Sequence, residues 1–130
     1  MTDPTYKRIF LFGALWNLLG GAFILATTNW IFSTAGVTPP SPPLYYQAWI
    51  GLFMVFGLGY YFVSRDLYRN RDIALLGAIG KIVFAAIFLY NMSTFRGQVP
   101  QFFLIPVVGD LVFAALFLIF FFAALRSGRT

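Results

Sequence analysis

Four long apolar segments, separated by short polar or proline-rich connections, dominate the chain. They run near residues 9–28, 46–63, 73–92 and 102–125. Each has about the 17–25 mostly apolar residues that a helix needs to cross a ~30 Å hydrocarbon core. Within lipid, a helix satisfies all of its own backbone hydrogen bonds. The pattern therefore predicts an all-α, transmembrane four-helix bundle that forms a single domain over residues 1–130.

The composition excludes the soluble alternatives. Hydrophobic residues make up 60% of the 130 residues and charged residues only 10%, whereas a soluble domain carries about 25% charged residues. A chain this short cannot bury so much apolar surface inside itself in water. A soluble enzyme, a disordered tail and a disulfide scaffold are therefore excluded, and the lipid bilayer is the expected surroundings.

Basic residues gather at one side of the predicted membrane. The N-terminus, the connection 64–72 and the C-terminus hold seven of them, whereas the other side has only Arg96. Cytoplasmic loops carry the excess of Lys and Arg in membrane proteins. We therefore expect a multi-pass protein of the bacterial inner membrane with both termini in the cytoplasm. Because these residues flank apolar runs rather than forming a stripe, we expect no nucleic-acid partner.

The first outer connection, residues 33–44, contains four prolines. Such a run favours an extended polyproline stretch, which predicts a stiff linker; a lid or docking strap is the alternative. Aromatic residues near the predicted membrane edges are typical interfacial anchors. They are Trp30, Phe32, Tyr45, Tyr46 and Trp49 on the outer side and Tyr60, Tyr61 and Tyr68 on the inner side.

The chain has no cysteine and no histidine. These absences remove the thiolate nucleophile, the iron–sulfur ligand and the commonest ligand of zinc and haem. Its four carboxylates, Asp3, Asp66, Asp72 and Asp110, are widely spaced. We expect neither a metal site nor a cofactor.

Lys81 is the most informative residue because it lies about eight residues inside the third apolar segment. A lysine near the bilayer centre costs about 2.5–3.5 kcal/mol on insertion scales unless it faces the bundle and finds a partner. Small residues share its helical face at spacings of three and four, and small residues allow helices to approach closely. They are Ala74, Gly77, Ala78 and Ala85. Lys81 should therefore point into the bundle.

Asp110 is the expected counter-charge, about eight residues into the antiparallel fourth segment. If that helix starts at Pro106, Asp110 lies closer to the outer surface, and a water or Asn17 is needed as a bridge. The pair is either a structural link that fixes helix register or an ionisable pair in a ligand or proton pathway.

Asn17 is the third polar residue of this predicted intramembrane cluster. It should lie at the depth of Lys81, since the first and third segments run parallel. A weak internal repeat at an offset of 64 also places Asn17 over Lys81, and implies two similar hairpins. Asn17 either bonds neighbouring helices together or lines a polar pocket with Lys81 and Asp110.

Several short motifs resemble those of small bacterial membrane proteins of the DoxX-like four-helix superfamily, over about residues 9–125. The motifs are Asn17 with Gly20 and Gly21, Gly57-x-Gly59-Tyr60, Gly80-Lys81 and Gly109-Asp110. The resemblance implies an accessory role beside membrane redox complexes, on their quinone side. It carries over no established catalytic set.

Three functions stay open. The first is a non-enzymatic binding or accessory subunit, with an apolar pocket for a lipid-like or quinone-like ligand guided by Asn17, Lys81 and Asp110. The second is a small proton-coupled transporter that works as a dimer. The third is a membrane-embedded, isomerase-like enzyme that uses Lys81 and Asp110. Whether the chain forms a homodimer or joins a larger membrane complex is also left open.

Overall fold

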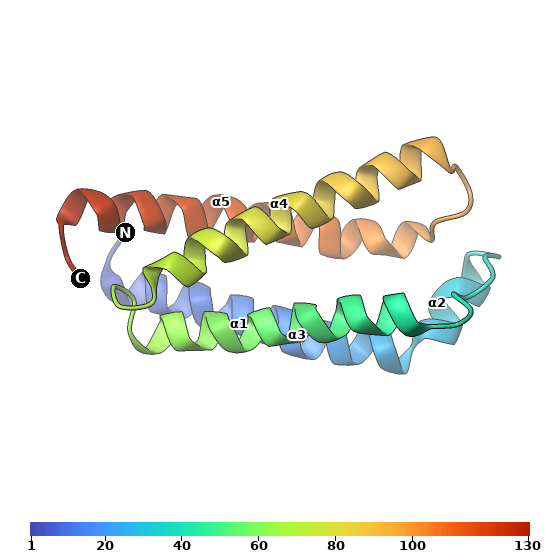
Figure 1. Ribbon diagram of the computed structural model, residues 1–130, viewed down its shortest axis with the longest axis horizontal. Coiled ribbons are helices and arrows are strands. Elements are labelled where there is room, and N and C mark those ends of the chain that lie inside the picture. The colour runs from blue at the N-terminus through green and yellow to red at the C-terminus, as the bar shows by residue number, and fades with distance from the viewer.

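The computed structural model describes residues 1–130 and contains helices but no strand (Figure 1). Four helices are long and apolar enough to cross a membrane, which confirms the all-α prediction of four helices of spanning length. The long helices are α1 (Asp3–Ala26), α3 (Leu44–Arg65), α4 (Arg71–Thr94) and α5 (Leu104–Ser127), and the short ones are α2 (Thr28–Thr34) and the 3₁₀ turn η1 (Gln101–Phe103).

The long helices extend beyond most ends of the predicted apolar segments. α1 begins at Asp3 rather than near residue 9, with Pro4 in its first turn, where a missing backbone N–H removes no helical bond. α1 ends at Ala26 rather than at Thr28, because Thr28 is the first residue of the separate helix α2. The hydroxyls of Thr27 and Thr28 bond to the carbonyls of Phe23 and Ile24 at this break.

The four long helices form two hairpins. α1 packs along α3, and α4 packs along α5, whereas α3 and α4 touch over a much shorter stretch. Figure 1 shows α4 close to α3 at their connection and farther from it towards the α4–α5 turn. Both termini lie at the end of the molecule that holds the α3–α4 connection (Figure 1).

Two apolar clusters fill the bundle, one towards each end. The cluster nearer the termini includes Phe10, Tyr60 and Phe117, and the cluster at the other end includes Ile50 and Phe103. The buried polar side chains of Asn17, Lys81 and Asp110 come from the helix segments between these two clusters. The polar groups are therefore closed off by apolar packing above and below.

A hydrogen-bonded cluster of Asp3, Tyr68 and Arg129 ties the termini to the α3–α4 connection. The Tyr68 hydroxyl donates to Asp3 at 2.7 Å and accepts from Arg129 at 2.9 Å. Arg129 also pairs with Asp3 at 3.2 Å. The bond to the Asp3 carboxylate favours the protonated phenol and raises the pKa of Tyr68 above its usual value. Tyr68 therefore links the N-terminal and C-terminal segments of the chain. The prediction that it is an interfacial anchor did not include this role.

Gly57 sets the close approach of α1 and α3. A Cβ at this position would lie 2.9 Å from the Cβ of Asn17 and 3.1 Å from the backbone oxygen of Ala14. Neither atom can move without shifting α1. The glycine is therefore required for this helix contact, whereas Gly51 on the same helix faces open space.

We expect Gly57→Ala to lower the free energy of unfolding by about 1–3 kcal/mol, because the added methyl overpacks the contact. Gly51→Ala is the matched control and should leave stability unchanged or raise it by up to about 1 kcal/mol, because alanine favours a helix more than glycine does. Circular dichroism during unfolding in mixed detergent micelles measures both. Equal stability of the two variants would contradict the tight α1–α3 contact.

Candidate functional site

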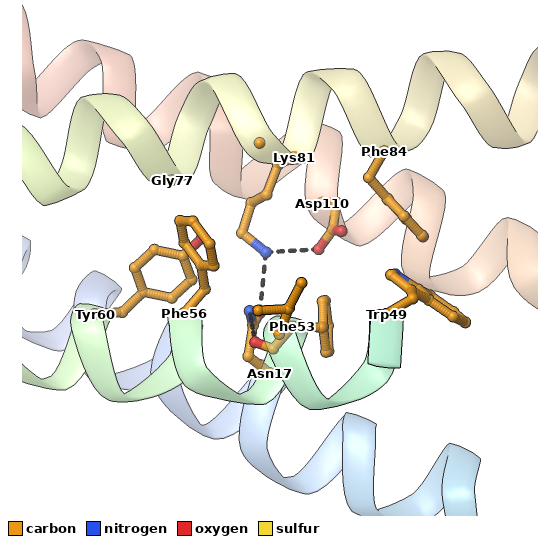
Figure 2. A pocket seen from close by; sticks show the side chains of 11 residues that line it. Asn17, Trp49, Phe53, Phe56, Tyr60, Gly77, Lys81, Phe84 and Asp110 are labelled. Atoms are coloured by element: carbon orange, nitrogen blue, oxygen red, sulfur yellow. Dashed lines mark hydrogen bonds and ion pairs between the residues drawn. The ribbon is translucent and has the colours of Figure 1, made fainter. Parts of the chain in front are cut away.

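Lys81, Asp110 and Asn17 form one hydrogen-bonded cluster in the middle of the bundle (Figure 2). The Lys81 Nζ atom donates to Asp110 Oδ1 at 2.7 Å and to Asn17 Oδ1 at 3.0 Å. The three residues are 3%, 0% and 1% exposed, respectively. The structure therefore brings together all three residues that the sequence nominated. Their role towards a ligand stays a prediction.

The face of α4 that carries Lys81 is built from small residues, as expected. Ala74, Gly77, Ala78 and Ala85 are all buried with Lys81, and α4 packs closely on α5 along its length. Small side chains let the two helices approach. Lys81 consequently points into the bundle, as predicted from its helical face.

Asp110 reaches Lys81 directly, so no water or Asn17 bridge is needed between them. α5 begins at Leu104, and Pro106 lies in its first turn, a position where proline is tolerated. α5 therefore begins before Pro106, and the alternative in which the helix starts at Pro106 is wrong. Asp110 thereby sits deep enough in the bundle for a direct ion pair.

Asn17 connects three helices through one amide group. Its oxygen on α1 accepts from Lys81 of α4, and its Nδ2 donates to the backbone oxygen of Phe53 on α3 at 2.7 Å. The second bond fixes which end of the amide faces the lysine. Asn17 thus bonds helices together and also lines the pocket described below.

Trp16 is a member of the site that sequence reasoning missed. Its indole Nε1 donates to Asp110 Oδ1 at 3.1 Å, and a Cβ at Gly109 would overlap its ring. A buried indole N–H usually finds an acceptor, and Asp110 is the only carboxylate within the predicted apolar segments. These two facts were the signal in the sequence that could have predicted the hydrogen bond between Trp16 and Asp110.

Aromatic rings surround the ammonium group of Lys81. The Nζ atom lies 5.4 Å from the ring centroid of Phe53, 5.3 Å from that of Tyr60 and 5.7 Å from that of Phe113. The negative ring faces attract a cation at such distances. Two oxygen acceptors and three aromatic rings therefore stabilise the lysine ammonium group.

A pocket of about 280 Å³ opens beside the cluster, between α3 and α4. Asn17, Lys81 and Asp110 contribute its polar groups, and Leu52 and Gly80 are its exposed rim residues. The remaining lining is mainly aromatic, as Figure 2 shows: Trp49, Phe53, Phe56, Tyr60, Gly77 and Phe84. Trp49 and Tyr60 therefore line this pocket, which corrects their interpretation as interfacial anchors.

Phe32 also departs from the anchor interpretation, because it is only 7% exposed and belongs to the apolar cluster farther from the termini. Trp30 and Tyr45 are exposed, as an anchor would be. Aromatic residues near the helix ends therefore divide between the exposed surface and the interior of the bundle.

No protein-family model, curated protein or solved structure matches the chain. The fold and the site themselves define the class of protein. It is an all-helical protein with four helices of membrane-spanning length and a buried, charge-neutral ion pair beside a pocket on its flank. Its function has to be argued from that geometry.

We expect Lys81→Met to lower the free energy of unfolding by roughly 3–5 kcal/mol, since it leaves the Asp110 carboxylate buried without a counter-charge. The double variant Lys81→Met/Asp110→Leu should recover most of that loss, because no buried charge remains. Unfolding in mixed micelles, followed by circular dichroism, measures each variant.

Asp72→Asn is the control for removing a charge. Asp72 pairs with Arg71 at 4.0 Å, and its side chain is 90% exposed, so its loss should cost less than about 1 kcal/mol. A double variant that is no more stable than Lys81→Met would show that packing, rather than an unpaired charge, causes the destabilisation.

Proposed function

We propose that this chain is a multi-pass protein of the bacterial inner membrane that binds a lipid-like or quinone-like ligand, as a binding or accessory subunit. The observation that carries the proposal is the pocket between α3 and α4, where an apolar, aromatic lining meets the buried Lys81–Asp110 pair. An apolar cavity with a few convergent polar groups is the usual form of a small-molecule site.

The position of the pocket favours a ligand that arrives from the bilayer. Lys81 is ten residues from the start of α4, or about 15 Å along a helix of about 36 Å. The rim residues Leu52 and Gly80 are exposed on the flank of the bundle, and Leu52 is 64% exposed. At this depth a spanning helix faces acyl chains. The mouth would then open to lipid rather than to water.

The lining suits a flat, apolar head group. The rings of Trp49 and Phe84 are stacked, with centroids 5.6 Å apart and an interplanar angle of 13°, and Phe53 and Phe56 add further aromatic surface. Aromatic faces pack well against other planar groups. The resemblance to the DoxX-like superfamily implies a role on the quinone side of membrane redox complexes, which also favours a quinone-like ligand.

The charge distribution supports an orientation with both termini in the cytoplasm. The termini and the α3–α4 connection share one end of the molecule (Figure 1), and seven of the nine basic residues lie in these segments or in the adjoining ends of the long helices. Cytoplasmic segments carry such an excess.

Filling the pocket should abolish ligand retention. Gly80→Leu places a side chain in the mouth, where a Cβ meets no other atom within 4 Å. Gly51→Leu is the control, since Gly51 faces equally open space but does not line the pocket. We expect native mass spectrometry of the purified protein, supplied with decylubiquinone, to show a bound ligand in the wild type and in Gly51→Leu but not in Gly80→Leu. Recovery of bulk phospholipid alone from all three proteins would contradict the proposal.

The orientation can be tested with single cysteines, because the chain has none of its own. Thr38 and Thr130 are both exposed threonines. Thr38 lies in the connection between α2 and α3, which Figure 1 shows at the opposite end of the molecule from the C-terminus. We expect a membrane-impermeant maleimide to label Thr38→Cys in intact cells, and Thr130→Cys only after the inner membrane is permeabilised. The reverse pattern would place the termini outside.

A further inference from the structure

The two carboxylate oxygens of Asp110 have very different surroundings. Oδ1 accepts hydrogen bonds from Lys81 at 2.7 Å and from Trp16 at 3.1 Å. Oδ2 accepts none, and it is the one buried side-chain oxygen or nitrogen in the chain that lacks a partner. Since Asp110 is 0% exposed, bulk water does not satisfy this atom either.

A buried acceptor without a donor is destabilising, most of all when it carries charge. None of the neighbouring donors is bonded to Oδ2, although the Lys81 ammonium has a third N–H and the Asn17 amide a second one. Lys81 donates to Asn17 and to Oδ1, the Asn17 amide donates to the Phe53 backbone, and Trp16 donates to Oδ1. In this arrangement Oδ2 receives no hydrogen bond from the cluster, so a donor from outside would satisfy it.

The free oxygen lies beside the pocket but has almost no exposed surface, so a ligand hydroxyl reaches it only by displacing the side chains that cover it. Asp110 is among the lining residues, and Figure 2 shows its second oxygen turned away from Lys81, on the side where Phe84 and Trp49 lie. A ligand packed against these rings is in the right part of the pocket to meet Asp110.

The charge of the site restricts the head group further. Lys81 and Asp110 are the only charged residues that line the pocket, and they neutralise each other at 2.7 Å. A carboxylate or phosphate head would find no unpaired cation and would face the free oxygen of Asp110. A neutral head group that donates a hydrogen bond would satisfy Oδ2 and would add no charge beside the neutral ion pair.

We propose that the ligand carries a neutral hydroxyl group that donates a hydrogen bond to Asp110 Oδ2. The inference rests on the proposed function and names the ligand class as apolar alcohols, a quinol or a long-chain alcohol, rather than acids or phosphate esters. A volume of about 280 Å³ is slightly below the range of about 300–1,000 Å³ that is usual for ligand sites. The pocket is large enough for the head group of such a molecule, and the apolar tail extends out of the pocket past Leu52 and Gly80.

The test compares ligands that differ only at the hydroxyl. The full-length protein in detergent is titrated with decylubiquinol and its dimethyl ether, and separately with hexadecanol and methyl hexadecyl ether, with native mass spectrometry as the readout. In at least one pair, we expect the hydroxyl compound to bind roughly tenfold more tightly than its ether, because the ether leaves Oδ2 unsatisfied. The pair that shows the preference identifies the source of the hydroxyl. Hexadecanoate should bind more weakly than hexadecanol.

The variant Lys81→Met/Asp110→Leu removes the free oxygen and keeps the site neutral, so the preference for the hydroxyl compound should disappear. Gly51→Leu should retain it. Infrared difference spectra of the wild type with ¹³C-labelled aspartate give a second readout that needs no variant. The hydroxyl compound should shift a carboxylate band, and the ether should not.

The outcomes separate the two proposals. If both members of each pair bind equally and Gly80→Leu abolishes both, the pocket is a ligand site but the hydroxyl preference is wrong. If no probe binds in a manner that depends on Gly80, both proposals fail. Tighter binding of hexadecanoate than of hexadecanol would overturn the choice of a neutral head.

Discussion

An ion pair held away from water is the constraint on which this structure depends. Removing a lysine and a carboxylate from water costs several kcal/mol per ion, and their attraction offsets this only when the geometry is close and further hydrogen bonds are made. The 2.7 Å contact between Lys81 and Asp110 meets the first condition. Asn17 and Trp16 meet the second from α1. Three of the four long helices thus supply polar groups to one charge pair, while α3 adds the Phe53 carbonyl and ring.

The helices were predictable because each apolar run is long enough to span a membrane and because lipid leaves the backbone few alternatives. Their ends were less predictable, since charged residues such as Asp3 and Arg65 continue the helix beyond the apolar run. The separate helix α2 also escaped prediction. Nothing in the apolar composition around Thr27 and Thr28 distinguishes a continued helix from a break at which their hydroxyls bond to backbone carbonyls.

The polar cluster was predictable from position, because a charge inside an apolar segment must find a partner and a small-residue face indicates where. The pocket beside it was not. Trp49 and Tyr60 lie near the ends of their segment, where aromatic residues serve equally well as lipid-facing anchors. Their inward orientation depends on the rotation of α3 and on how far α4 lies from it. The rotation of α3 depends on its packing against α1, and its distance from α4 depends on contacts between the two hairpins. Spacing within one segment encodes neither.

The hairpin arrangement has a consequence for how the chain enters the membrane. Lys81 and Asp110 are 29 residues apart and belong to the two helices of one hairpin, α4 and α5. The second hairpin can therefore neutralise its own charges before it meets the first. If the two helices leave the insertion machinery together, each brings the counter-ion of the other, and neither has to cross the hydrocarbon core alone with a full charge. For a chain that spans a membrane, this order of helices would lower the barrier to insertion as well as stabilise the assembled bundle.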